Sequence, residues 1–173
     1  AHLSVANDVQ EQPLSAAPRS KRNRPRHVPN MLFEGRRLPT EAELDKAAAL
    51  LNGASRVAIL AGRGALGAAE ELGRTADLLA APVAKALLGK AVLPDDHPHS
   101  TGGIGMLGTL PSQEAMEQCD ALLIVGSTFP YIEYYPKPGQ ARGVQIDRDG
   151  QRIGLRYPVE AGLVGDAAET LRL

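Results

Sequence analysis

The chain has 173 residues, 43% of them hydrophobic, so it is long and apolar enough to bury a core of ordinary size. Its formal net charge of -1 and its low aromatic content (3%, with no tryptophan) argue against a nucleic acid or an anionic membrane surface as a partner. The one cysteine, Cys119, excludes an internal disulfide framework and is typical of a reducing, cytoplasmic location.

The first segment, residues 1–12, opens on the strand-like alternation AHLSVANDVQ and lacks a start methionine. We therefore expect the chain to be a fragment of a longer protein. Residues 13–38 are rich in proline and in basic side chains. They allow two interpretations, an arm that binds nucleic acid or a solvated linker across the surface of another domain. The rest of the chain is net acidic, which favours the linker.

The pattern predicts a first helix after Thr40, because TEAE is a capping box that satisfies two backbone amides at a helix N-terminus. This helix is expected to end near Gly53. The continuous apolar run at 56–61 is typical of a parallel strand that is buried on both faces. A helix at about 66–80 and a short strand at 82–86 are expected to follow.

The second half of the chain continues this alternation. The glycine- and proline-rich stretch 89–111 is predicted to be mostly loop. After it we expect a short helix at about 112–118, strands at 121–125, 143–146 and 162–164, and a helix from about Ala167. Strands of parallel type that alternate with helices predict an α/β fold: a doubly wound, mainly parallel, Rossmann-like sheet with helices on both faces.

Gly62, Gly64 and Gly67 have the G-x-G-x-x-G spacing of a dinucleotide-binding turn between a strand and a helix. A ligand phosphate could approach such a turn, but a tight turn alone also requires glycine, so both interpretations stay open. An ordinary NAD site needs an acidic residue roughly 20 residues further on to bind the ribose. The sequence there is PVAKALLGK, with Lys85 and Lys90 and no acid, which argues against an NAD-dependent dehydrogenase.

Other predicted strand ends also carry groups suited to a ligand. Asp147 follows one strand and Asp166 another, and either carboxylate could accept hydrogen bonds from a ribose or an adenine. The alternative is that each carboxylate only caps the helix or turn after it. A third strand ends in Gly126, Ser127 and Thr128, and the segment TGGIGMLG adds further glycines. Their joint placement favours a binding site at one edge of the sheet.

Five segments together resemble a known family: AHLSVANDVQ, PVAKALLGK, TGGIGMLG, GSTFPYIEYYP and VQIDRDGQRIGLRYPVEAGLVGD. They are similar to the central domain of thiamine diphosphate-dependent enzymes. The nearest branch is that of pyruvate oxidase and pyruvate:quinone oxidoreductase, which is related to acetolactate synthase. The resemblance runs through 56–173. It implies that residues 1–12 are the tail of a preceding pyrimidine-binding domain, 13–38 a linker and 39–173 the central domain.

In flavin-containing members of this family, the central domain holds FAD in an extended pose along the carboxyl edge of the sheet. The resemblance implies that the diphosphate faces Gly62, Arg63 and Gly64 and that the cofactor is lined by Ala86, Leu87, Gly102, Gly103, Ile104 and Gly105. It also implies contacts to the ribityl part from Gly126, Ser127, Thr128, Phe129 and Pro130, and to the adenosine from Asp147 and Asp166. Gly103 departs from the bulkier residue that many relatives have there.

The resemblance assigns the catalytic chemistry to the rest of the parent chain, where N- and C-terminal thiamine-binding domains would hold thiamine diphosphate and Mg2+. The parent would be a homodimer or homotetramer, with membrane contact only if it reduces quinone. We expect no catalytic residues in this domain and no metal at His97, His99, Asp95 and Asp96.

Two other functions are open. Simple decarboxylases of the family keep this fold without flavin, so a purely architectural domain that binds no nucleotide is the first alternative. A stand-alone NAD-using domain of the deacylase type is the second, and the absence of a histidine in a suitable motif argues against it.

Overall fold

The computed structural model describes residues 3–12 and 36–173, which belong to two separate units. In the first unit, one helical turn, α1 (Asn7–Gln10), stands where the sequence had suggested a strand. A strand needs a hydrogen-bonded neighbour, and no residue among 3–12 supplies one. The predicted linker, 13–38, lies almost entirely outside the described residues.

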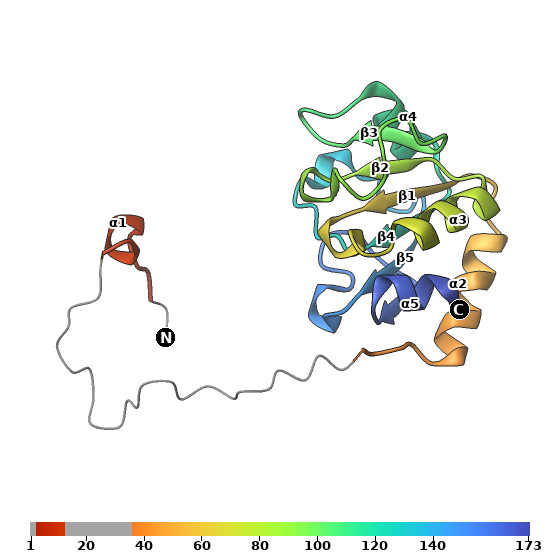
Figure 1. The fold of residues 1–173 in the computed structure, drawn as a ribbon, viewed down its shortest axis with the longest axis horizontal. Coiled ribbons are helices and arrows are strands. Elements are labelled where there is room, and N and C mark those ends of the chain that lie inside the picture. Colours follow the sequence, from red (N-terminus) through yellow and green to blue (C-terminus); the bar gives the residue numbers. More distant parts are fainter. Residues whose placement is uncertain (1–2, 13–35) are drawn as a thin grey trace. The chain divides into compact units, whose positions relative to one another are not determined.

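The second unit is built on a sheet of six strands, and every neighbouring pair in it is parallel. The strand order is β3-β2-β1-β4-β5-β6, so the chain reverses direction across the sheet between β1 and β4 (Figure 1). The strands are β1 (Val57–Ala61), β2 (Val83–Lys85), β3 (Ser100–Gly103), β4 (Ala121–Val125), β5 (Arg142–Asp147) and β6 (Ala161–Val164). The predicted doubly wound α/β fold is confirmed.

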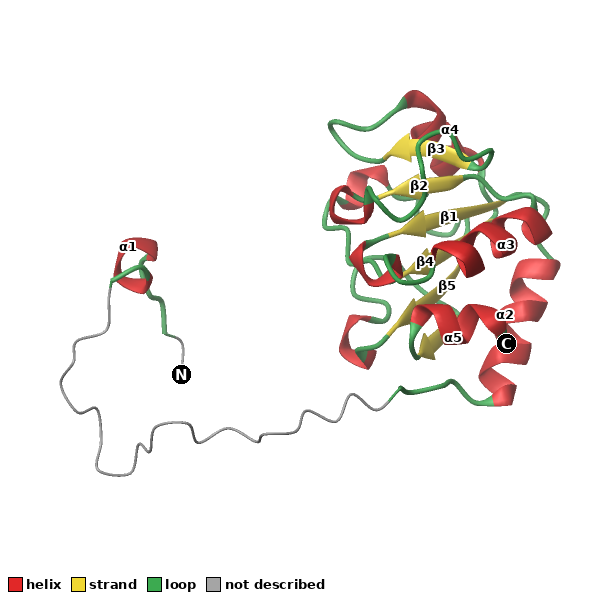
Figure 2. Cartoon of the chain, in the orientation of Figure 1, coloured by secondary structure: helices red, strands yellow, loops and turns green. Residues whose placement is uncertain are grey.

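Helices cover both faces of this sheet (Figure 2). One face carries α2 (Glu41–Asn52), α3 (Ala69–Leu79) and α5 (Ala167–Arg172), and the other carries α4 (Leu110–Gln118) beside β2 and β3. The capping box of α2 is confirmed, because Thr40 accepts from the Glu43 amide while the Glu43 carboxylate accepts from the Thr40 amide. Four 3-10 helices lie in the connections: η1 (Arg63–Ala65), η2 (Leu87–Gly89), η3 (Ile132–Tyr134) and η4 (Gly150–Arg152). In the described residues, no helix is both long and apolar enough to cross a membrane.

The core consists of two apolar layers, one on each side of the sheet. Alternate residues of the central strands point to opposite faces, so Ile59 and Leu123 pack under α2, α3 and α5, while Leu60 and Leu122 pack toward α4. Because all five residues of β1 and of β4 are buried, these strands appear in the sequence as unbroken apolar runs.

One strand was not predicted. The stretch 89–111 is mostly loop, as expected, but it also contains the edge strand β3, whose sequence STGG has no apolar residue and whose residues are all half-buried. Hydrogen bonds from Val83 N–H to the His99 carbonyl (2.8 Å) and from Ile104 N–H to the Lys85 carbonyl (3.0 Å) tie it to β2. An edge strand needs only one partner and little burial, so its sequence carries no hydrophobic signal.

Asp120 ties the end of α4 to the start of β1. Its carboxylate accepts hydrogen bonds from the backbone amides of Arg56 (2.8 Å) and Ser55 (2.9 Å). The Arg56 amide, and then the Ser55 amide, stabilise the charged form and lower the pKa of Asp120 below its ordinary value.

This contact should make stability depend on pH. A carboxyl group whose pKa is lowered by folding stabilises the protein above its unfolded pKa of about 3.9 and loses that contribution as pH falls through the folded pKa. We therefore expect Asp120→Asn to flatten the loss of stability of the chain between about pH 4 and pH 2. Urea unfolding at a series of pH values measures this. An equally steep loss of stability in the variant would contradict the assignment.

Candidate functional site

Because all six strands are parallel, their carboxyl ends lie along one edge of the sheet. In open α/β sheets the usual ligand position on this edge is the point at which the strand order reverses, here between β1 and β4. The predicted site residues are the segments that leave the strands at this edge: Gly62–Gly64 after β1, 86–87 after β2, 102–105 at the end of β3, 126–130 after β4, Asp147 at the end of β5 and Asp166 after β6.

The first two glycines of the turn after β1 are required for contact between backbones. A Cβ atom at Gly62 would lie 2.5 Å from the Gly126 carbonyl oxygen, and one at Gly64 would lie 2.8 Å from the Gly126 Cα atom. The Gly62 and Gly64 amides donate to the carbonyls of Val125 and Gly126, each at 2.9 Å. Gly126 itself has a φ of +57°, which favours glycine. The turns after β1 and β4 therefore pack directly together.

The third glycine of the motif, Gly67, has no such reason to be glycine, because a Cβ atom there would meet no atom within 4 Å. Between the glycines, Arg63 has an exposed side chain. The interpretation of the motif as a tight turn thus has direct structural support at Gly62 and Gly64. The Gly62 and Gly64 amides already donate to carbonyls of the chain, so a phosphate bound at this turn would need Arg63 and other backbone amides as its donors.

At the end of β2, where an NAD site would have an acid, Lys85 points inward and is 1% exposed. Its ammonium group donates to the Leu93 carbonyl (2.9 Å) and to the carboxylate of Asp95 (2.6 Å). The hydrogen bond from Lys85 and then its charge lower the pKa of Asp95. Lys85 therefore anchors the loop between β2 and β3 and is turned away from the ligand edge. Next along the chain, Ala86 is buried and Leu87 is exposed.

The segment 102–105 reaches across to the segment after β4. Gly102 and Gly105 have φ angles of +95° and +109°, which only glycine adopts readily. A Cβ atom on Gly105 would lie 3.1 Å from the ring of Phe129, so the two segments are in contact. Ile104 and Phe129 are both buried in the layer on the α4 side of the sheet. At Gly103 the nearest atom to an added Cβ would be 3.8 Å away, so a larger residue fits here.

The segment after β4 is held by its own hydrogen bonds. The Ser127 hydroxyl accepts from the Phe129 amide (3.2 Å), and the Tyr135 hydroxyl donates to the Phe129 carbonyl (3.0 Å). Of its other members, Thr128 is half-buried and Pro130 is exposed. Tyr135 was not predicted to belong to the site, because nothing in its local sequence distinguishes it from the neighbouring tyrosines.

The two aspartates differ in what their carboxylates already bind. Asp147 is 8% exposed, and one of its oxygens accepts from the Asp149 amide at 3.0 Å. For its second oxygen we find no partner among the described residues. Asp166 is the N-cap of α5 and accepts from the amides of Ala168 and Glu169 (3.1 and 3.3 Å). Helix capping therefore accounts for the placement of Asp166, which binds both amides through one oxygen, so each aspartate has a second oxygen for which we find no partner among the described residues.

Other candidate groups form no site. In the part of the chain that the structure describes, no three His, Cys, Asp or Glu residues are grouped to hold a metal ion. His97 and His99 lie with ring centres 5.9 Å apart, and the His99 ring pairs with Asp77 at 2.7 Å. Burial raises the pKa of the Cys119 thiol to about 11, so this thiol stays protonated and is a poor nucleophile.

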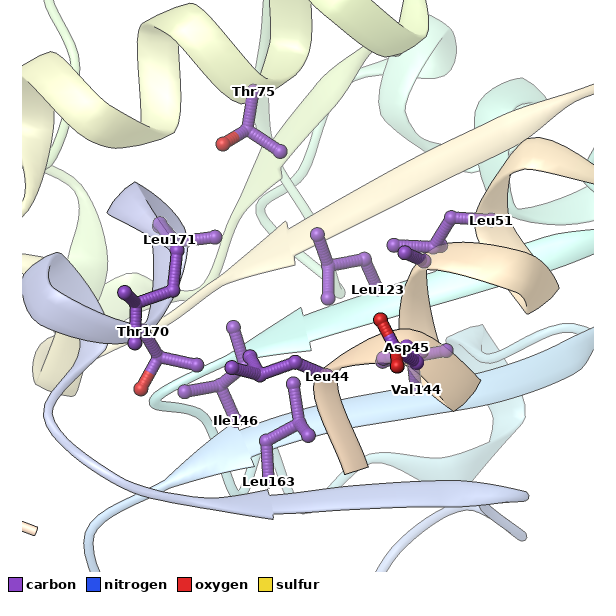
Figure 3. A pocket seen from close by; sticks show the side chains of 13 residues that line it. Leu44, Asp45, Leu51, Thr75, Leu123, Val144, Ile146, Leu163, Thr170 and Leu171 are labelled. Carbon is purple, nitrogen blue, oxygen red and sulfur yellow. The ribbon is translucent and has the colours of Figure 1, made fainter. Parts of the chain in front are cut away.

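A cavity of about 210 Å³ lies away from the strand edge, between the sheet and the layer formed by α2, α3 and α5 (Figure 3). Its walls are mostly apolar, including Leu44, Leu123 and Ile146. Polar groups in its lining come only from Asp45, Thr75 and Thr170, and the Thr75 hydroxyl donates to the backbone of its own helix. The cavity lacks the converging polar groups of a cofactor site and is best described as a gap in helix packing.

The strand order defines this domain as a Rossmann-like α/β domain. The sequence profile of the family described as thiamine pyrophosphate enzyme, central domain, matches residues 44–173. The chain belongs to this family.

Individual proteins that are similar to this chain include ones with thiamine pyrophosphate or thiamin diphosphate in their names or assignments. The chain is 42% identical over 170 residues to a Bacillus subtilis (strain 168) protein provisionally named thiamine pyrophosphate-containing protein YdaP, covering 98% of this chain and 28% of the relative. It is 33% identical over 178 residues to a protein of Methanocaldococcus jannaschii assigned as an acetolactate synthase large subunit, covering 99% and 29%. An X-ray structure of a provisionally assigned thiamin diphosphate-dependent enzyme from Mycobacterium smegmatis superposes with a TM-score of 0.64 at 28% identity, covering 79% and 27%. The chain thus spans less than a third of the length of these relatives.

Proposed function

We propose that this chain is the FAD-binding central domain of a thiamine diphosphate-dependent enzyme that acts on a 2-oxo acid. In this proposal the parent resembles pyruvate oxidase or pyruvate dehydrogenase (quinone), and the domain bridges the two thiamine-binding domains. The observation that carries the proposal is the adjacency of Gly62–Gly64, Gly126 and Asp147. The Gly64 amide donates to the Gly126 carbonyl, and the Gly126 amide donates to the carbonyl of Ile146, next to Asp147.

The residues at this edge suit an extended dinucleotide in several respects. Arg63 supplies an exposed positive charge for a diphosphate. The glycines on either side of it have no side chain that would keep a ligand away from the backbone. Asp147 offers a carboxylate oxygen to a ribose hydroxyl. When bound, FAD would supply electron-transfer chemistry, while thiamine diphosphate and Mg2+ would be held by other domains of the parent. In this proposal the chain binds and orients FAD and contributes no catalytic residue of its own.

The second candidate is an architectural domain that binds no nucleotide. It is favoured by the hydrogen bonds that occupy the Gly62 and Gly64 amides and the Asp166 carboxylate within the chain. Under this alternative the glycines serve only the packing of the turns after β1 and β4. The NAD-using deacylase alternative has no such support, since the acid expected for a ribose is replaced by the inward-facing Lys85.

Flavin content of the parent enzyme separates the two candidates. We expect the purified parent to be yellow, and Asp147→Ala to weaken FAD binding by about 1–3 kcal/mol, the range for removing one partner of a buried hydrogen bond. The flavin content is measured by the absorbance and mass of the cofactor that denaturation releases. The FAD affinity of Asp147→Ala is measured by equilibrium titration of the apoenzyme with FAD. The control is Asp96→Ala, which makes the same change in charge at an exposed aspartate outside the proposed binding segments.

Two outcomes would count against FAD binding at Asp147. A parent that contains no flavin and takes up none would favour the architectural domain. Equal FAD affinity in Asp147→Ala and in the wild type would reduce Asp147 to a turn residue. A homodimeric or homotetrameric parent and a cytoplasmic location stay predictions of the sequence.

A further inference from the structure

Gln145 is a polar residue in the middle of a buried strand. It lies on β5 opposite Ile124 of β4 and is 2% exposed. Burial of an amide in an apolar layer costs free energy unless its donors and acceptor are all satisfied. Its presence among the apolar residues of GVQID therefore calls for partners.

The partners come from the turns after two different strands. The side-chain amide nitrogen of Gln145 donates to the Arg152 carbonyl (3.1 Å) and, in a longer bond, to the Ser127 carbonyl (3.4 Å). Its oxygen accepts from the Gly154 amide at 2.9 Å. Since a backbone amide can only donate, the Gly154 contact fixes which end of the Gln145 amide faces which partner.

We propose that Gln145 is a positioning residue that fixes the turn after β4 (126–130) and the turn after β5 (148–154) relative to each other at the ligand edge. The first turn leaves β4, which borders the reversal point, and the second leaves the neighbouring strand β5 immediately after Asp147. Through Ser127, whose hydroxyl accepts from the Phe129 amide, the effect of Gln145 extends along the first turn. One buried side chain thus connects the turn 126–130, predicted to contact the ribityl part of FAD, with the turn after Asp147, predicted to contact its adenosine part.

The part of this inference that concerns a ligand rests on the proposed FAD binding, whereas the coupling of the turns does not. The test variant is Gln145→Met, which keeps a similar volume and removes every hydrogen bond of the side chain. The matched control is Ile146→Val, a buried change at the next residue of the same strand; the Ile146 side chain makes no hydrogen bond, and its backbone carbonyl, which accepts from the Gly126 amide, is not altered by the substitution.

In the full 173-residue chain, we expect Gln145→Met to speed amide hydrogen exchange at Gly154 by about tenfold relative to Ile146→Val, the effect of one lost hydrogen bond. Exchange at Phe129 should also become faster, by a smaller factor, because its amide keeps the Ser127 hydroxyl as acceptor while the Ser127 carbonyl loses its bond from Gln145. Exchange of β1 amides should follow global stability in both variants. We also expect the dissociation constant for FAD to rise by about tenfold in Gln145→Met and to stay unchanged in Ile146→Val. Faster exchange in only one turn, or equal exchange in both variants, would overturn the positioning role.

The outcomes separate the two proposals. If Gln145→Met exchanges faster in both turns but neither the chain nor the parent binds FAD, the positioning role is kept and the proposed function is rejected. If Gln145→Met binds FAD as tightly as the wild type and its amide exchange is unchanged, the proposed function is kept and the positioning role is rejected. If Gln145→Met does not fold, NMR of the wild-type chain decides, because the Gln145 side-chain NH2 protons should exchange slowly and show NOEs to Ser127 and Arg152. Rapid exchange with solvent would reject the role.

Discussion

Replacing Gly62 by alanine is expected to lower the free energy of unfolding by about 3 kcal/mol, at the upper end of the usual cost of overpacking. The added Cβ atom would lie 2.5 Å from the Gly126 carbonyl oxygen and 2.7 Å from the Ser127 Cα atom. Both are backbone atoms, so neither can move aside by rotating a side chain. Relief would require the turns after β1 and β4 to separate, which would break the hydrogen bond from Gly64 to Gly126.

The same motif supplies the control. Gly67→Ala adds the same methyl group where no atom lies within 4 Å and should change stability by less than about 0.5 kcal/mol. Urea denaturation of both variants measures the difference. Equal destabilisation by the two substitutions would mean that the close contact of Gly62 with Gly126 does not explain the glycine, and would restore the interpretation of all three glycines as a ligand turn.

The second large effect is expected at Lys85, whose side chain is almost completely buried. Lys85→Ala removes the apolar stem together with the ammonium group, leaves a cavity beneath the loop between β2 and β3, and should cost about 3 kcal/mol. Lys85→Met keeps the stem and removes only the charge. Because the substitution removes a buried charge that is costly to desolvate, while the Asp95 carboxylate is 72% exposed and stays hydrated without its partner, we expect a cost of about 1 kcal/mol or less.

Thermal and urea unfolding of the two Lys85 variants distinguish packing from charge. A methionine variant as unstable as the alanine variant would show that the hydrogen bonds to Leu93 and Asp95 dominate, contrary to this prediction. Amide exchange in the loop 86–99 adds a local measurement. It should increase in both variants, since both lose the bond from the Lys85 ammonium group to the Leu93 carbonyl.

Much of the fold was predictable because its signals are local. The capping box at Thr40 and the unbroken apolar runs of β1 and β4 correspond closely to the observed elements. The edge strand β3 was missed because STGG pairs through its backbone and buries no apolar side chain. Helix α3 begins at Ala69, later than predicted, because the 3-10 helix η1 occupies the start of the connection.

The candidate site was predictable in position and less so in chemistry. Parallel strands bring their carboxyl ends to one edge, so the neighbourhood of Gly62, Gly126 and Asp147 follows from the order of elements. The bonding of individual groups does not follow from it. Asp166 and Asp147 are alike in sequence context, yet the first caps a helix by accepting from two of its amides and the second accepts from one amide of the turn that follows it.

The sequence by itself determined that this chain forms buried parallel strands alternating with capped helices, and its motifs identified the family. Only the tertiary structure decided which glycines are obligatory, which way Lys85 points and what Gln145 binds. The physical reason is that these properties depend on contacts between segments far apart in the chain, such as the backbone contact of Gly64 with Gly126 and the hydrogen bond from the Gln145 side chain to Ser127. Periodicity and capping act within a few residues, whereas close packing of turns exists only once the sheet has formed.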